Sequence, residues 1–252
     1  IDKTVGISSI EGGYKNASNR FDSFLSEGFS NYAQFSSDPS KNASSQMSPY
    51  FHFGHISTHE VFEKLVKHES WSPEQIKPNL VGRREGWWGG SLNFDSFLDE
   101  LITWRELGYH TCVRRANYNQ YSSLPEWAVK TLQEHANDER EHVYSLDQLT
   151  YSETHDEIWN AAQNQLREQG IIQNYLRMLW GKKILEWSPN PQIALSYMIT
   201  LNDRYALDGR DPNSYSGVFW VLGRYDRAWG PERDIYGKIR YMTSDSAARK
   251  FN

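Results

Sequence analysis

Aromatic and charged side chains recur at helical spacing between residues 174 and 187. Asn174, Arg177 and Met178 stand three and four positions apart, so they share one face of a helix. Trp180 and Trp187 are seven positions apart, within about 20° of one stripe. Indoles in such a row could conduct electrons or stack on a ligand. Core packing by the tryptophans and a surface ion pair at Arg177 are the ordinary alternatives.

Acidic residues follow the next predicted helix. Asp208 and Asp211 lie in the turn-forming run Asp208-Gly209-Arg210-Asp211-Pro212. They could pair with a buried arginine or accept hydrogen bonds from an N–H group of a ligand. Acidic residues on a glycine turn also commonly cap a helix or turn the chain, and the sequence leaves both readings open.

A carboxylate and an indole are neighbours on another predicted helix. Glu100 and Trp104 stand four positions apart. Together they could hold a base flipped out of a duplex, with the carboxylate at its edge and the indole at its face. Alternatively, Glu100 interacts with the helix dipole and Trp104 fills the core.

Tryptophan and arginine alternate near the end of the chain. Trp220 and Trp229 are separated by a glycine-containing segment that carries Arg224 and Arg227. This mixture suits damaged or single-stranded nucleic acid. A hydrophobic patch beneath a long loop would use the same residues.

The overall charge gives a mixed indication about nucleic acid. The 252 residues carry a net charge of −5, which argues mildly against a partner that is bound through its phosphates. From Arg224 onward, however, seven basic residues stand against four acidic ones. A basic face on an acidic body is therefore possible. The ten tryptophans and fifteen tyrosines fit either core packing or a stacking surface.

Several classes of protein are disfavoured. No apolar run is long enough to span a membrane, and Ile1-Asp2-Lys3 does not begin a signal peptide. The single cysteine, Cys112, excludes an internal disulfide and suits a reducing, cytoplasmic compartment. No Cys/His cluster has the spacing of a zinc site, so no metal is expected.

Helix-start and helix-stop patterns indicate which elements position these residues. Ser57 with Glu60 forms a capping-box pattern, as does Thr154 with Glu157. Gly170 stands where the second of these helices should end. The first helix is expected to run to about residue 68.

The sequence as a whole predicts an all-α fold in a single domain, residues 1–252. Apolar periodicity adds helices over residues 95–116, 171–187 and 191–207. Alternating strand patterns are scarce, and no strand–glycine turn–helix unit supports a Rossmann fold. Long loops are expected near 36–48, 69–94 and 208–238.

Taken together, these motifs resemble the C-terminal, FAD-binding half of the photolyase/cryptochrome family, closest to its class II cyclobutane-pyrimidine-dimer photolyases. The resemblance runs nearly end to end, and its motifs stand in the family's order. They are Met47–Ser57, Glu100–Leu107, His135–His142, Arg177–Trp187, Leu201–Pro212 and Gly237–Met242. The N-terminal α/β antenna domain of that family is expected to be absent.

The resemblance implies that FAD is the only cofactor. The residues implied at its diphosphate are Tyr32, Ser45, Gln46, Met47 and Ser48. Those implied around the isoalloxazine are Asn174, Arg177, its partner Asp208, and Asn202 facing flavin N5, with Arg105 and Asp211 as further candidates.

It also implies an electron path and a lesion site. Trp180 would lie nearest the flavin, Trp159 in the middle and Trp187 near solvent. The residues implied in the pocket for a flipped pyrimidine dimer are Glu100, Trp104, Met178 and Trp220, with Trp229 and Arg240 filling the gap in the duplex.

The implied function is light-driven repair of UV-damaged DNA by a monomeric deoxyribodipyrimidine photolyase, with reduced FAD as the electron donor. Two alternatives remain open at this point. One is a cryptochrome-like photoreceptor with the same FAD and tryptophan chain. The other is a FAD-containing binding module without photochemistry.

Overall fold

A computed structural model gives the structure of residues 5–41, 43–83 and 85–251. The start of the chain, used above to argue against a signal peptide, lies outside the described residues. The described residues form helices and, as their only bridge pairing, an isolated antiparallel bridge between Arg233 and Gly237. The predicted all-α class is confirmed. Within these ranges, no helix combines the length and apolarity that crossing a bilayer requires.

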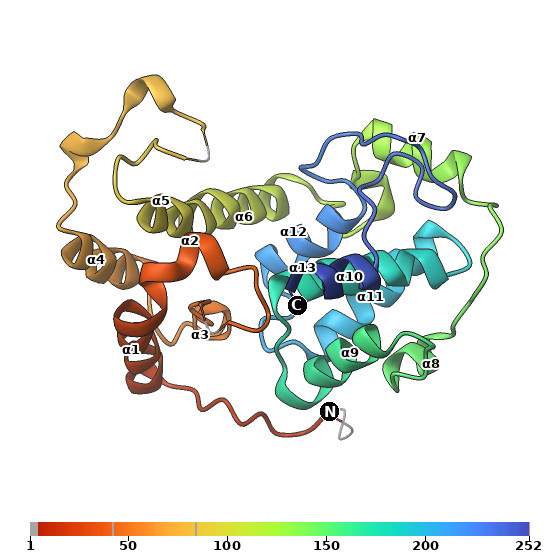
Figure 1. The fold of residues 1–252 in the computed structure, drawn as a ribbon, viewed down its shortest axis with the longest axis horizontal. Coiled ribbons are helices and arrows are strands. Elements are labelled where there is room, and N and C mark those ends of the chain that lie inside the picture. The colour runs from red at the N-terminus through yellow and green to blue at the C-terminus, as the bar shows by residue number, and fades with distance from the viewer. Residues whose placement is uncertain (1–4, 42, 84, 252) are drawn as a thin grey trace. The chain divides into compact units, whose positions relative to one another are not determined.

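The chain divides into two compact units (Figure 1). The small unit is Ile10–Leu107, and the large unit is Ile1–Ser9 with Gly108–Asn252. Each has its own buried hydrophobic cluster. The single FAD-binding domain expected from the sequence stays a prediction.

The small unit is built on aromatic packing. The ring of Phe24 lies 5.3 Å from that of Phe97 and 5.7 Å from that of Tyr32. Its helices are α1 (Tyr14–Ser23), the π-helical η1 (Phe24–Gly28), the 3-10 turn η2 (Phe29–Asn31), α2 (Tyr32–Phe35), α3 (Ser48–His52), α4 (Thr58–Glu69), the 3-10 turns η3 (Pro73–Gln75) and η4 (Pro78–Leu80), α5 (Leu92–Leu98), the π-helical η5 (Asp99–Trp104) and the start of α6 (Arg105–Arg114).

Two helix predictions in the small unit are confirmed. Ser57 caps α4, because its hydroxyl accepts the backbone N–H of Glu60 at 3.1 Å. The helix predicted over 95–116 is present as α5, η5 and α6, which follow one another without a break (Figure 1). Its middle is π-helical, a form that periodicity alone does not distinguish from an α-helix.

The glycine-rich turn between Gly86 and Gly90 packs on a buried carboxylate. Asp95, 1% exposed, accepts the backbone N–H of Gly90 at 3.2 Å. Burial raises the pKa of Asp95, opposed by hydrogen bonds from the backbone of Gly90, Gly86 and Gly89. The turn therefore encloses the start of α5, which gives it a structural role that the sequence did not reveal.

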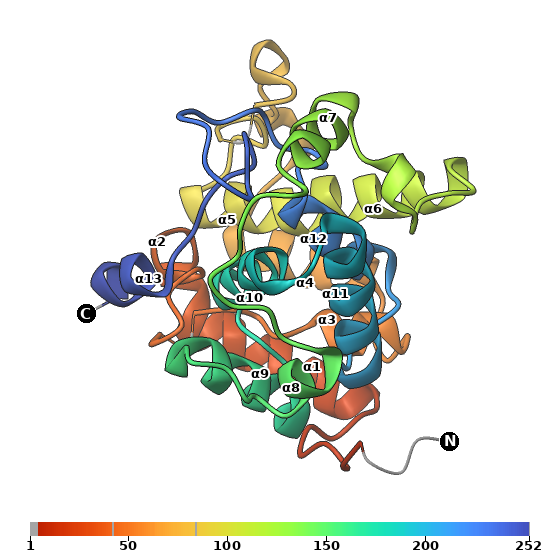
Figure 2. The same cartoon turned by 90° about the vertical axis from the view of Figure 1, so that its right-hand side faces the viewer.

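Helix α10 is the centre of the large unit. Figure 2 shows α10 with α9, α11 and α12 around it, and each of these helices packs on it. The helices of this unit are the rest of α6, the 3-10 turn η6 (Tyr121–Ser123), α7 (Glu126–Glu134), α8 (Leu146–Thr150), α9 (Glu157–Gln169), α10 (Asn174–Trp187), α11 (Pro191–Tyr205), α12 (Pro212–Val221) and α13 (Ser244–Phe251).

Three local predictions in the large unit need correction. The cap of α9 is Asp156, whose carboxylate accepts the N–H of Trp159, whereas Thr154 hydrogen-bonds to Asn160. Helix α10 starts only at Asn174, because the Gln173 side chain caps it there. The loop expected over 208–238 contains α12. Gly170 ends α9 in the left-handed conformation, as predicted.

We expect Gly89→Ala to destabilise the small unit strongly. Gly89 has φ +74°, and a Cβ built there would lie 1.9 Å from the carbonyl oxygen of Gln75. Backbone strain and overpacking together should cost about 3 kcal/mol or more of unfolding free energy, measured by denaturant titration.

Gly82→Ala is the matched control. Gly82 has φ +79°, but a Cβ there would meet no atom within 4 Å. Only the strain, about 1–2 kcal/mol, should appear. Equal losses for the two variants would show that contact with Gln75 does not constrain the turn.

Candidate functional site

Three buried tryptophans form a connected ladder in the large unit. The indole N–H of Trp159 donates to the carbonyl oxygen of Trp180 at 3.0 Å. The ring of Trp159 lies 5.6 Å from that of Trp187, at 72°. Trp159 thus contacts both other members, the position expected of the middle one. All three side chains are buried.

A glutamine fixes the inner end of the ladder. The indole N–H of Trp180 donates to Oε1 of Gln163 at 2.8 Å, and Gln163 is fully buried. Sequence reasoning missed this residue. The available signal was its place four positions after Trp159, on the face of α9 that the ladder occupies.

Trp187, at the outer end of the ladder, lines a pocket of about 420 Å³. The ring of Trp187 contacts those of Tyr144 and His155, at 5.5 and 5.2 Å. Lys183 lies 5.4 Å from the same ring and pairs with Glu186 at 2.8 Å. Burial, and then the neighbouring His142, lower the pKa of His155. Polar and charged groups therefore surround the outermost indole.

The predicted pair between Arg177 and Asp208 is present. Both terminal nitrogens of Arg177 lie 3.4 Å from Oδ1 of Asp208, and the two side chains are 16% and 15% exposed. This long contact between half-buried charges leaves hydrogen-bonding capacity on the guanidinium. Asn174 and Met178, on the same helix, are exposed and half-buried, respectively.

Asn202 lies on α11, six positions before Asp208 in the sequence. It is buried, and its amide N–H donates to the Ser214 hydroxyl. The turn after α11 folds back on it, since a Cβ on Gly209 would lie 2.8 Å from the Asn202 carbonyl oxygen. Asp211 caps α12 by accepting the N–H of Asn213 at 2.9 Å, which is the ordinary role weighed for it above.

A second cluster gathers tryptophans and arginines around one carboxylate. Asp226 accepts hydrogen bonds from Nε and Nη2 of Arg240, at 3.1 and 3.2 Å, and from the indole N–H of Trp229 at 3.1 Å. Arg240 lies 4.1 Å from the Trp229 ring and 5.0 Å from the Trp220 ring. The structure therefore brings Trp220, Trp229 and Arg240 together, as expected, and adds Asp226.

Charge and burial act against each other at Asp226. Burial works to raise the pKa of this carboxyl, but the hydrogen bonds from Arg240, the Arg227 backbone and Trp229 outweigh it. The net effect holds the pKa below its usual value, so Asp226 is ionised at neutral pH. Nothing in the sequence marks it, because its partner Arg240 lies fourteen positions away.

The remaining predicted site residues lie in the small unit. Glu100, exposed, and Trp104, half-buried, both belong to the π-helical turn η5. The Trp104 indole donates to Asp99 at 3.2 Å. Arg105 lies 5.6 Å from the ring of Phe51.

The predicted diphosphate loop is held from behind by Arg20. Its guanidinium donates to the carbonyl oxygens of Ser44 and Ser45, at 3.0 and 2.9 Å. In a trans peptide, C=O and N–H point in opposite directions, so the N–H groups of Ser45 and Gln46 point away from Arg20. Two adjacent donors of this kind suit an anion. Tyr32 and Met47 are buried core residues, whereas Gln46 and Ser48 are exposed.

The described residues contain no group of three His, Cys, Asp or Glu side chains placed to bind a metal.

No family model matches the chain. Comparison with curated proteins is decisive. A deoxyribodipyrimidine photo-lyase of Methanothermobacter thermautotrophicus is 42% identical over 244 residues, covering 97% of this chain and 49% of the relative. The photo-lyases of Potorous tridactylus and rice are 38% and 41% identical, covering 100% and 92% of this chain and 44% and 42% of the relatives.

The chain belongs to the photolyase/cryptochrome family. It spans less than half the length of these relatives. Solved structures share its fold. A class III photolyase of Agrobacterium tumefaciens matches with a TM-score of 0.65 at 19% identity, over 95% of this chain and 42% of that one. A Synechocystis cryptochrome matches with 0.68 at 13%, over 100% and 45%.

In this photolyase/cryptochrome chain, we expect Asp208→Ala to destabilise the large unit by about 1–3 kcal/mol, because Arg177 loses its partner in a half-buried site. The double variant with Arg177→Ala should lose less than the sum of the two single variants. Denaturant titration of the four proteins measures this coupling.

Glu134→Ala is the control. Its partner Lys130 is 76% exposed at 4.0 Å, so the loss should stay below about 1 kcal/mol. Additive losses at Arg177 and Asp208 would mean that the two charges do not interact.

Proposed function

We propose that this chain repairs cyclobutane pyrimidine dimers in DNA under blue light, as the catalytic part of a class II type deoxyribodipyrimidine photolyase. The observation that carries the proposal is similarity along nearly the whole chain to relatives named photo-lyases. The ladder from Trp180 through Trp159 to Trp187 supports the proposal. Indoles can be oxidised transiently, so a connected row of buried indoles can carry electrons, whereas core packing alone would not require tryptophan at all three positions.

FAD is the proposed cofactor. The donors of Ser45 and Gln46 fit its diphosphate without a cationic side chain, with Tyr32, Met47 and Ser48 as the neighbouring predicted residues. Arg177, held by Asp208, would bind the isoalloxazine together with Asn174 and Asn202, and Arg105 and Asp211 are further proposed contacts. When bound and reduced, FAD would supply the light absorption and the electron that splits the dimer.

The protein's own part is binding and orientation. Glu100, Trp104, Met178 and Trp220 would bind the extruded dimer, and Trp229 with Arg240 would occupy the gap left in the duplex. Extrusion costs a few kcal/mol and least for a poorly paired lesion, which favours damaged DNA. The electron would return to the cofactor after the dimer splits, so Trp187, Trp159 and Trp180 would not act in each turnover; they would pass electrons inward to restore the reduced state after an oxidation.

The light-sensor alternative has less support. The curated relatives described above are named photo-lyases. The match to the cryptochrome, at 13% identity, shows only that the two chains share a fold. No observation favours a binding module without photochemistry.

Illumination of the chain, reconstituted with FAD and reduced, should restore oligonucleotides that contain a thymine dimer. Loss of the dimer is measured by chromatography, with the same mixture kept in the dark as the control. Retained dimers after illumination, with FAD bound, would contradict the proposed activity.

Trp180→Phe should slow the photoreduction of bound FAD, because phenylalanine is much harder to oxidise than an indole. The readout is the visible absorbance under blue light with an external reductant. Trp71→Phe is the control, since Trp71 is a buried tryptophan of the small unit whose N–H donates to the Trp88 carbonyl. Equal slowing in both variants would argue against a specific path through the ladder.

A further inference from the structure

A lysine lies in the core of the large unit without a carboxylate hydrogen-bonded to it among the described residues. Lys182, on α10, is fully buried. Lysine is almost never fully buried unless it is paired, because its charge is costly to remove from water. The mechanism above does not use it, although it stands two residues from Trp180.

The amino group of Lys182 reaches the end of another helix. Its Nζ donates to the carbonyl oxygen of Val221 at 2.5 Å, and Val221 is the last residue of α12. Carbonyls in the last turn of a helix lack a partner within that helix, and the helix dipole favours a cation there. The contact needs close packing: a Cβ on Gly181 would lie 2.6 Å from Cγ2 of Val221. Lys182 thus caps α12 from a neighbouring helix.

The same amino group lies against Trp220. Its Nζ is 5.4 Å from the centre of the Trp220 ring, and Trp220 is the residue before Val221. Arg240, which pairs with Asp226, lies 5.0 Å from the same ring. The Trp220 ring therefore has two cationic groups beside it, one buried and one at the surface.

We propose that Lys182 is a positioning residue for Trp220, and that engagement of a damaged DNA strand at this cluster is linked to the binding of a proton by Lys182. This rests on the proposed function, because it takes Trp220, Trp229 and Arg240 to be the residues that meet the DNA. The ligand class is a polyanionic strand with an extruded base.

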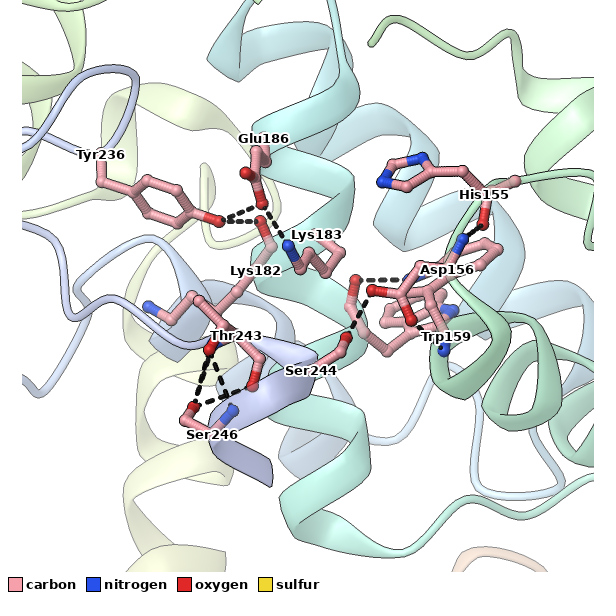
Figure 3. A network of polar contacts seen from close by, with 12 residues as sticks. His155, Asp156, Trp159, Lys182, Lys183, Glu186, Tyr236, Thr243, Ser244 and Ser246 are labelled. Carbon is pink, nitrogen blue, oxygen red and sulfur yellow. Dashed lines mark hydrogen bonds and ion pairs between the residues drawn. The ribbon is translucent and has the colours of Figure 1, made fainter. Parts of the chain in front are cut away.

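The charges around Lys182 support this link. Burial lowers the pKa of Lys182 to about 7, Asp226 opposes the shift and Arg240 adds to it. Tyr236 contacts the same residue through its hydroxyl, which donates to the Lys182 carbonyl and to Glu186 (Figure 3). A phosphate placed at Arg240 would offset the positive charge there and raise the pKa of Lys182.

The sign of the effect follows from linkage. If the strand favours the charged amino group, the complex holds more protons than the free chain above neutral pH. Affinity for lesion-containing DNA should then fall as pH rises from 6 to 9. Each unit of pKa difference corresponds to tenfold, so we expect a loss of about three- to tenfold.

The first test needs no DNA. The chain is labelled with ¹³C at lysine Cε and titrated by NMR, and the Lys182 resonance is assigned by its absence in Lys182→Met. A midpoint near 7 is expected. A midpoint near that of an exposed lysine overturns the proposal.

The second test measures binding of a duplex with one thymine dimer against pH, by fluorescence anisotropy. The wild-type chain should show the pH-dependent loss, and Lys182→Met should bind more weakly at pH 6 with a flatter profile. Lys183→Met, which removes a lysine facing Trp187 instead, should keep the wild-type profile.

Lys182→Gln guards against a folding defect, since it keeps a neutral donor for the Val221 carbonyl. This variant should bind lesion-containing DNA, and its affinity should not show the fall with rising pH that Lys182 gives the wild-type chain. Lesion binding with the same pH profile in wild type and both Lys182 variants overturns the proton link but leaves the repair proposal intact. Absence of lesion binding at every pH overturns both.

Discussion

The structure of the large unit depends on the burial of α10 from Leu179 to Leu185 on every side. A helix in that position has no water for its polar side chains, so each must find a partner in the surrounding elements. Trp180 meets Gln163 of α9, Lys182 meets the end of α12, and Lys183 meets Glu186 of its own helix. These contacts fix how α9 and α12 lie on α10.

These two helices meet different side chains of α10. Toward α9, the Trp159 indole bonds to the Trp180 carbonyl and contacts the Trp187 ring, which lines a polar pocket. Toward α12, the buried amino group of Lys182 lies against Trp220 and near the ion pair of Asp226 with Arg240. The tryptophan ladder and the charged cluster that we propose to meet DNA are thus supported by the same packed helix.

The sequence predicted the helices better than their ends or partners. Periodicity identified the helix that contains Glu100 and Trp104, because its apolar face is regular. The capping pattern at Thr154 failed because Asp156, two residues on, is the better acceptor for the Trp159 N–H. Helix α12 was missed although Asp211-Pro212 is a typical start, a capping residue followed by proline at the first helical position.

The site was predictable only where its residues have a family pattern. Trp180 and Trp187 stand at helical spacing, but Trp159 was placed between them by resemblance alone. Gln163, Lys182 and Asp226 have partners that lie seventeen, thirty-nine and fourteen positions away. Such contacts exist only in the folded chain, and of these three residues only Gln163 carried a local signal, its place four positions after Trp159.

Gly108 lets α6 approach the beginning of α12 closely. A Cβ there would lie 2.8 Å from the Asn213 side chain and 3.1 Å from the Pro212 carbonyl oxygen. Both residues belong to the first turn of α12, so even alanine at position 108 would displace that turn. A helix moves as a stiff rod, and the displacement would therefore reach the far end of α12, where Lys182 meets Val221.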